Sequence, residues 1–181
     1  VTLGGGSGTA VVRFSLRLAA LPSTTVSLFA VVPSGGNTAY LAYDSASGRL
    51  GVRWGAGAIT TAAVAAEAGA WYVVEMRVGL GSPHTLEWRL DGAPQTAASS
   101  SESARTVSSL QFGTTAAGVT YVAHFDDALV SLTSADYPLG NGKVLALAID
   151  GAGTHNGAGN FRDSDNSAID AGSWTRIDDV P

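Results

Sequence analysis

The sequence predicts an all-β protein whose strands form an antiparallel β-sandwich. Three observations support this class. Apolar and polar residues alternate along several short segments, as in strands with one face in a core and one in solvent. Clusters of Gly, Pro, Ser, Asn and Asp separate these segments at short intervals. Helical segments do not alternate with the strands, so a sandwich of about nine strands is more economical than a parallel α/β sheet.

The chain opens with two contrasting strands and a hairpin. Residues 10–18 alternate between large apolar residues and Arg or Ser, which predicts a half-buried antiparallel strand. Residues 26–32 are almost entirely apolar, which predicts a strand covered on both faces. Residues 38–43 and 49–54 then form a hairpin, in which Gly48 is available for a positive φ in the turn.

The segment after this hairpin has two interpretations. Residues 58–64 are rich in Ala and Thr and predict a weak strand followed by a loop. Residues 61–70 can instead form a helix, because alanine has the highest helix propensity. The regular spacing of the flanking strands favours the first interpretation.

The second half of the chain continues the sandwich. Residues 71–80 and 85–90 alternate strongly and predict two half-buried strands. Residues 95–105 are rich in Ser and Ala and predict a polar loop. Residues 107–112 and 119–132 are two further strands, the second interrupted by two adjacent aspartates.

The predicted organisation is one domain with an appendage at each end. A chain of 181 residues with 45% hydrophobic content is long enough for one core. Residues 1–9 are a Gly-rich lead-in, residues 10–150 form the sandwich with a last strand at 144–149, and residues 151–181 are an extended irregular tail. Three isolated apolar residues of the tail are expected to dock on the chain itself or on a neighbour: Phe161, Ile169 and Trp174.

The charge and composition of the chain argue against several partners. The 10 Lys and Arg residues are outnumbered by 15 Asp and Glu, and Lys143 is the single lysine, which disfavours binding to nucleic acid or to an acidic membrane surface. The absence of cysteine excludes disulfides and thiolate metal sites. The long uncharged stretches are broken by Ser, Thr, Gly or Pro, so no membrane span is predicted. The N-terminal ten residues show no signal-peptide pattern.

Several phrases, taken in order, resemble a known family. VVRFSLRLAALP, GRLGVRW, GAWYVVEMRV, HTLEWRLDG and HFDDALV occur in the order and spacing of concanavalin A-like, laminin G-like jelly-roll domains. The segment DYPLGNGKVLALAIDGAGTHNGAGNF resembles the corresponding part of laminin G-like proteins encoded by tailed bacteriophages and prophages. The resemblance covers residues 10–165 and implies a concanavalin A-like jelly-roll fold and a phage context.

The resemblance also implies a structural calcium ion, for which Asp126 and Asp127 are the candidate ligands. Calcium prefers six to eight oxygen ligands, usually several carboxylates with backbone carbonyls. The alternative follows from strand geometry, because adjacent residues of a strand point to opposite faces. One carboxylate would then face solvent, and the other would cap a bulge or accept backbone N–H bonds.

Other arrangements typical of catalysis or metal binding are missing from the sequence. Sandwich glycosidases need two close carboxylates, whereas the glutamates are far apart in sequence: Glu67, Glu75, Glu87 and Glu102. The histidines lack the spacing of a zinc site: His84, His124 and His155. The acidic segment 163–170 lacks the Gly and Glu positions of an EF-hand loop. The sequence therefore predicts a protein that is not an enzyme.

Binding of carbohydrate would require aromatic residues exposed on a sheet face or a loop rim. The candidates are Tyr40, Tyr43, Trp54 and Trp174. Trp71 and Trp88 lie in strongly alternating segments and are expected in the core.

Two functions follow as hypotheses. The first is a structural virion protein of a tailed phage, a capsid decoration, minor capsid or tail-associated module on the particle surface. It would bind other virion proteins, form a homo-oligomer or symmetric array, and need its tail for particle association. The second is a carbohydrate-binding adhesion module that recognises host or environmental glycans.

Overall fold

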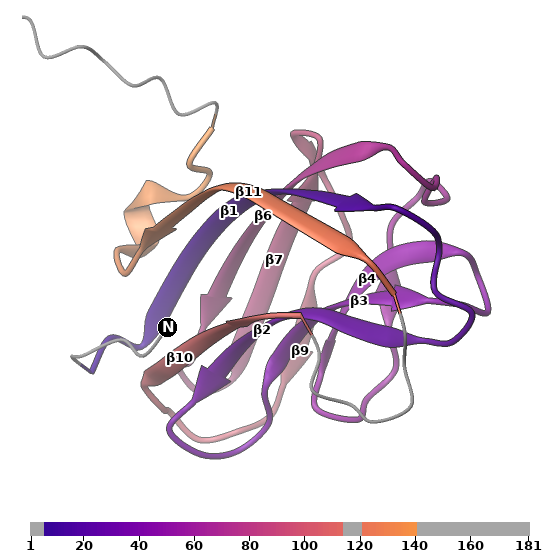
Figure 1. Ribbon diagram of the computed structural model, residues 1–181. Helices are drawn as coiled ribbons and strands as arrows, with labels where there is room; N and C mark the ends of the chain where they lie inside the picture. The colour runs from indigo at the N-terminus through magenta and orange to yellow at the C-terminus, as the bar shows by residue number, and fades with distance from the viewer. Residues whose placement is uncertain (1–5, 114–120, 141–181) are drawn as a thin grey trace, which may run out of the picture. The chain divides into compact units, whose positions relative to one another are not determined.

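The computed structural model describes residues 6–113 and 121–140, and these residues form two antiparallel sheets packed as a sandwich (Figure 1). One sheet has the strand order β11-β1-β6-β7-β8, with β9 also paired to β7, and the other has the order β10-β2-β3-β4-β5. The strands are β1 (Thr9–Leu18), β2 (Val26–Pro33), β3 (Ala39–Asp44), β4 (Arg49–Trp54), β5 (Thr60–Thr61), β6 (Trp71–Gly79), β7 (His84–Leu90), β8 (Ala93–Pro94), β9 (Ala98–Ser100), β10 (Val107–Phe112) and β11 (Ala123–Ser131).

This architecture confirms the predicted all-β sandwich and is consistent with a jelly roll. Within the described ranges, the one helical element is a single 3-10 turn, η1 (Ser134–Asp136). None of the described helical residues forms a segment of the length and apolar character needed to cross a membrane.

The sequence misplaced some of the smaller elements. β5 is only two residues long, and residues 61–70 contain no helix despite their alanine content. Just before β5 the chain approaches β4 closely, since a Cβ on Gly51 of β4 would lie 2.5 Å from the Ile59 side chain. The predicted loop 95–105 contains the short strand β9, which pairs with β7 at its His84 end.

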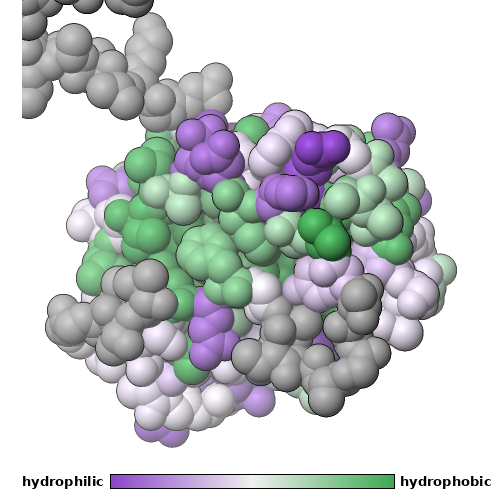
Figure 2. Space-filling model, in the orientation of Figure 1, coloured by the Kyte–Doolittle hydropathy of each residue, from purple (hydrophilic) through white to green (hydrophobic). Residues whose placement is uncertain are grey.

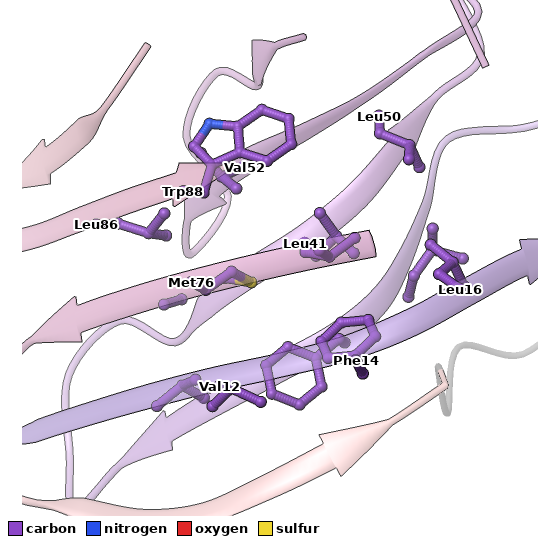
Figure 3. Close-up of a cluster of buried hydrophobic side chains, with 14 of the residues drawn as sticks. Val12, Phe14, Leu16, Leu41, Leu50, Val52, Met76, Leu86 and Trp88 are labelled. Carbon is purple, nitrogen blue, oxygen red and sulfur yellow. The ribbon is translucent and has the colours of Figure 1, made fainter. Parts of the chain in front are cut away.

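The alternating residues of both sheets meet in one core, part of which Figure 3 shows. Trp88 is the largest fully buried side chain among the described residues, and its indole N–H donates to the Thr96 carbonyl at 3.0 Å. This bond satisfies the indole polar group inside the core. The labelled side chains of Figure 3 come from both sheets: Val12, Phe14, Leu16, Leu41, Leu50, Val52, Met76, Leu86 and Trp88.

Four phenylalanines pack where β10 and β11, the edge strands of the two sheets, come together. The Phe14 ring centroid lies 4.9 Å from that of Phe29, 5.6 Å from that of Phe112 and 5.8 Å from that of Phe125. Phe112 and Phe125 are themselves 5.3 Å apart in an edge-to-face arrangement. The cluster therefore links both edge strands to the core through Phe14.

The β3–β4 turn is held by the Asp44 carboxylate. It accepts hydrogen bonds from the Ser47 hydroxyl at 2.6 Å, the Ala46 amide at 3.2 Å and the Thr25 hydroxyl at 3.3 Å. The Ser47 bond, the largest single cause, lowers the pKa of Asp44 below its ordinary value of 3.8. The turn that the sequence predicts at DSASG is present, and Gly48 has a φ of 68°.

The lowered pKa of Asp44 predicts a pH dependence of stability. A carboxyl group whose pKa is lower in the folded state stabilises the fold above its unfolded pKa, and this contribution is lost as the pH falls through the folded pKa. We expect Ser47→Ala to weaken the fold at pH 7 and to have a smaller effect at a pH low enough to protonate Asp44 in the folded protein. Urea unfolding of both proteins at the two pH values measures this, and an equal effect at both would contradict it.

Several predicted features lie outside the described residues. These are the 144–149 strand and the 151–181 tail with its docking residues Phe161, Ile169 and Trp174. The first five residues of the Gly-rich lead-in are also outside.

Candidate functional site

A row of side chains crosses the outer face of the five-stranded sheet. The strand register places Gln111 of β10 beside Ala30 of β2, Ala30 beside Tyr40 of β3, and Tyr40 beside Arg53 of β4. The residues that alternate with this row, such as Leu41, are fully buried in the core. Tyr40, Arg53 and Gln111 therefore project from the face of the sheet that points away from the sandwich interior.

These side chains line a hollow of about 560 Å³, which we call the Tyr40 hollow. Its lining residues are Ser27, Ala30, Gly36, Asn37, Thr38, Tyr40, Arg53, Gly55, Ala56, Gln111 and Gly113. The Arg53 guanidinium carbon lies 5.5 Å from the centre of the Tyr40 ring, and its Nη2 donates to the Ser27 hydroxyl at 3.2 Å. The hollow thus combines an aromatic ring with a positioned cation and several hydrogen-bonding groups.

Asn37 is fixed at the rim of this hollow by residues from two distant loops. Its backbone amide donates to both carboxylate oxygens of Glu102, at 3.0 and 3.1 Å. Its side-chain oxygen occupies the space beside Gly55, where an added Cβ would come within 2.5 Å. Gly36 has a φ of 81°, and a Cβ there would meet the Glu102 carboxylate. Both glycines are therefore needed for the position of Asn37.

A second hollow, of about 670 Å³, adjoins the first, and we call it the Trp54 hollow. It shares Asn37 and Ala56 with the Tyr40 hollow. Its lining residues are Asn37, Trp54, Ala56, Gly57, Ala58, Thr60, Ala97, Ala98, Ser99 and Ser100. They come from the loop before β3, the end of β4, the segment that leads into β5, the first residue of β5, and β9 with its preceding residue.

Trp54 is 7% exposed, and its indole Nε1 is buried without a hydrogen-bond partner among the described residues. Behind it lies the ring of His84, with a centroid separation of 5.2 Å. The His84 Nε2 contacts the Ser103 carbonyl at 2.9 Å, whereas its Nδ1 is also buried without a partner in the described ranges. Unsatisfied buried polar atoms are uncommon in native proteins and call for a partner such as a ligand or a water molecule.

The structure treats the aromatic candidates differently. Tyr40 lines the outer hollow as a partly exposed residue. The prediction that Tyr43 is exposed for glycan binding is wrong, because Tyr43 is 4% exposed and packs in the core. The alternation of β3 places its side chain on the same face as Leu41. Trp54 likewise faces the sandwich interior and meets a hollow only at its margin. Trp174 lies outside the described residues.

Sequence reasoning missed other residues of this region. Trp71, on the other sheet, was expected in the core but is 50% exposed, because it alternates with the buried Tyr72 and so faces outward from β6. Arg53, Asn37 and Gln111 were not candidates, although Arg53 alternates with core residues of β4 and so had to face outward. Recognising Arg53 and Gln111 required the register that aligns them with Tyr40, and recognising Asn37 required the loop contact with Glu102.

Asp126 and Asp127 form a β-bulge in β11. The register between β1 and β11 shifts between Arg13 and Ser15, opposite this pair. Asp127 has a φ of 50°, and its amide donates to the Asp126 side chain at 2.8 Å. This is the geometry of the alternative in which one aspartate closes a bulge. Both residues are exposed.

These aspartates do not fit a calcium site through the described residues alone. No group of three or more His, Asp or Glu side chains that could hold a metal occurs in residues 6–113 and 121–140. Two carboxylates supply too few of the six to eight oxygens that calcium requires. The calcium ion remains a prediction of the family resemblance.

The outer face of the other sheet brings together two glutamates that are far apart in sequence. Glu75 on β6 lies opposite Arg89 on β7, and Arg77 lies opposite Glu87. Glu87 forms an ion pair with Arg77 at 2.6 Å, and the buried Glu75 accepts a hydrogen bond from the Gly140 amide at 2.8 Å. Both carboxylates are thus engaged by neighbouring protein groups.

Tyr137 lies over this charged region. Its ring is 4.9 Å from the Arg77 guanidinium carbon, and burial raises the pKa of the Tyr137 phenol above its usual value. A hollow of about 440 Å³ beside it is lined by Arg13, Val73, Glu75, Arg89, Asp91, Gly92, Pro138 and Gly140.

Comparison with solved structures supports the β-sandwich fold. No protein-family model and no curated protein matches the chain. Among solved structures, the chain is similar to a cellulose-induced protein, Cip1, with a TM-score of 0.54 and 18% identity over 70% of this chain and 68% of Cip1. It is also similar to the alginate lyase Aly36B, with a TM-score of 0.55 and 12% identity over 70% of each chain.

A third similar structure is the sialidase of Trypanosoma rangeli, with a TM-score of 0.56 and 14% identity over 72% of this chain. The chain spans only 22% of that sialidase. At these identities the similarity concerns the sandwich fold, which agrees with the concanavalin A-like class. The phage context predicted from sequence is not addressed by these three structures.

Proposed function

We propose that this protein is a non-catalytic carbohydrate-binding module whose ligand lies in the Tyr40 hollow. The observation that carries the proposal is the combination of Tyr40 with Arg53, Asn37 and Gln111 on one open sheet face. An aromatic ring can pack against the apolar face of a sugar, while planar guanidinium and amide groups pair with its hydroxyls. The volume of the hollow falls within the range of roughly 300–1,000 Å³ typical of small-molecule sites.

Two further observations support the proposal. The names of the similar structures include a sialidase and an alginate lyase, which are proteins named for action on glycans. The glutamates brought together on the opposite sheet are held by Arg77 and by the Gly140 amide. A carboxylate that is already paired is poorly suited to act as a general acid or base, which favours binding over catalysis.

A glycan array followed by calorimetry tests the proposal. We expect the full chain to bind at least one class of glycan on the array. Tyr40→Ala should lower the affinity by about tenfold or more, since it removes the ring from the hollow, and tenfold corresponds to about 1.4 kcal/mol. Trp71→Ala is the matched control, because Trp71 is exposed but lies outside the lining of the Tyr40 hollow. Equal losses in both variants, or no glycan binding by the full chain, would contradict the proposal.

A structural role in a phage virion is the second candidate, and one surface favours it. β11 exposes Leu129 by 43% and Val130 by 45%, and Val122 just before it by 55%. Phe112 of β10 is 39% exposed nearby. Apolar side chains gather on the face seen in Figure 2, where β10 and β11 lie toward the viewer in Figure 1. Exposed apolar patches of this kind mark protein interaction sites.

The partner that this surface suits best is a second copy of the chain. β11 ends the strand order of its sheet, so one edge of its backbone is available for pairing within the part of the chain described. A two-fold axis would bring the same apolar strip of two copies together. Light scattering of the full chain distinguishes the cases: a dimer or larger assembly supports this candidate, and a monomer at all concentrations argues against it.

A further inference from the structure

We propose that the Tyr40 hollow and the Trp54 hollow are adjacent subsites for one glycan chain, so that the ligand is an oligosaccharide of at least two sugars. This inference rests on the proposed function and extends it. The two hollows have Asn37 and Ala56 in common, so a ligand that leaves one enters the other at these residues. Asn37 can contact both sugars because its amide group carries donors and an acceptor.

The Trp54 hollow has a buried hydrogen-bond donor that lacks a partner. Trp54 lines the hollow, is more than nine-tenths buried, and has no acceptor for its Nε1 among the described residues. The contrast is Trp88, whose indole N–H is satisfied by the Thr96 carbonyl. Leaving a buried donor unpaired costs about 1–3 kcal/mol. This nitrogen is buried from solvent beside the His84 ring, whose Nδ1 also lacks a partner among the described residues, so the ligand contacts of this subsite come from the residues that form its walls.

The walls of the Trp54 hollow are suited to a polar ring. Alanine and glycine form half of them, namely Ala56, Gly57, Ala58, Ala97 and Ala98. Hydroxyl groups of Thr60, Ser99 and Ser100 lie among these small side chains and can both donate and accept hydrogen bonds. The result is a space bounded by short side chains with hydroxyls for pairing, as a second sugar requires.

The electrostatics of the two hollows define which chains to test. Among the described residues that line them, Arg53 is the one with a formal charge. A guanidinium binds carboxylates through paired N–H groups. Alginate oligosaccharides, which carry a carboxylate on each sugar, are therefore the first probe, and cello-oligosaccharides of the same lengths are the neutral comparison.

The test is the dependence of affinity on chain length, measured by calorimetry with the monosaccharide and the hexasaccharide of both series. In the series that binds, we expect the hexasaccharide to bind the full chain at least about fivefold more tightly than the monosaccharide, about 1 kcal/mol. Thr60→Val removes a hydroxyl from the wall of the Trp54 hollow with little change of shape and should reduce this advantage. Tyr40→Ala should weaken both lengths.

A second variant avoids any effect on the core. Ser99→Trp places a large side chain at an exposed rim of the Trp54 hollow and should also abolish the length dependence. Ser23→Trp, in the exposed connection between β1 and β2, is the control for Ser99→Trp and should leave the length dependence of the affinity unchanged. Equal affinity for both lengths in the unmodified chain would overturn the subsite inference and leave the Tyr40 site standing. Absence of binding at every length in both series would overturn both the subsite inference and the proposed function.

Discussion

Replacement of Phe14 by alanine is expected to lower the free energy of unfolding by about 3–5 kcal/mol, the range for removal of a large aromatic side chain from a core. Phe14 is fully buried and contacts the rings of Phe29, Phe112 and Phe125. Its loss would remove the ring that links the edge strands of both sheets. Since small domains have a total stability of about 5–15 kcal/mol, a large fraction of the fold's stability depends on this residue. Urea or thermal unfolding measures the change.

Phe112→Ala is the matched control for this prediction. Phe112 belongs to the same aromatic cluster but is 39% exposed, so less of its apolar surface is removed from water. Its replacement should therefore cost clearly less than that of Phe14. A loss for Phe112→Ala equal to or greater than that for Phe14→Ala would show that Phe14 does not have the central position in the cluster that the structure gives it.

The fold could be predicted from sequence because its core follows a simple repeat. In β1, β6 and β7 the large apolar residues occupy every second position, and the structure buries them in the same order. The elements that were missed depend on long-range pairing. β9 is a short Ala and Ser segment without an apolar pattern. It is a strand because its backbone pairs with β7.

The candidate site was harder to predict for two physical reasons. Aromatic residues can serve the core or the surface, and the face of the strand that each one occupies decides between them, as the buried Tyr43 and the exposed Trp71 show. The polar residues of the Tyr40 hollow come from four separate strands and loops, so no local pattern marks them. Asp126 and Asp127 stood out in the sequence because charge interrupts an apolar strand, and the structure gives this pair the geometry of a bulge.

Replacement of Gly55 by alanine is expected to lower stability and to weaken glycan binding together. Gly55 has a φ of 51°, where a residue with a Cβ costs roughly 1–2 kcal/mol. The new Cβ would also lie 2.5 Å from the Asn37 side-chain oxygen, so Asn37 must move. Because Asn37 lines both hollows, this movement should lower the affinity for the hexasaccharide by about tenfold, or about 1.4 kcal/mol.

Gly48→Ala separates the two effects in Gly55→Ala. Gly48 has a similarly positive φ of 68°, but no atom lies within 4 Å of its added Cβ. This variant should incur the same backbone cost of roughly 1–2 kcal/mol and leave glycan binding unchanged. The difference between the two variants then reports the displacement of Asn37 alone. If Gly55→Ala bound the hexasaccharide as tightly as Gly48→Ala does, Asn37 would have no part in recognition, and the junction of the two hollows would have to be assigned to other residues.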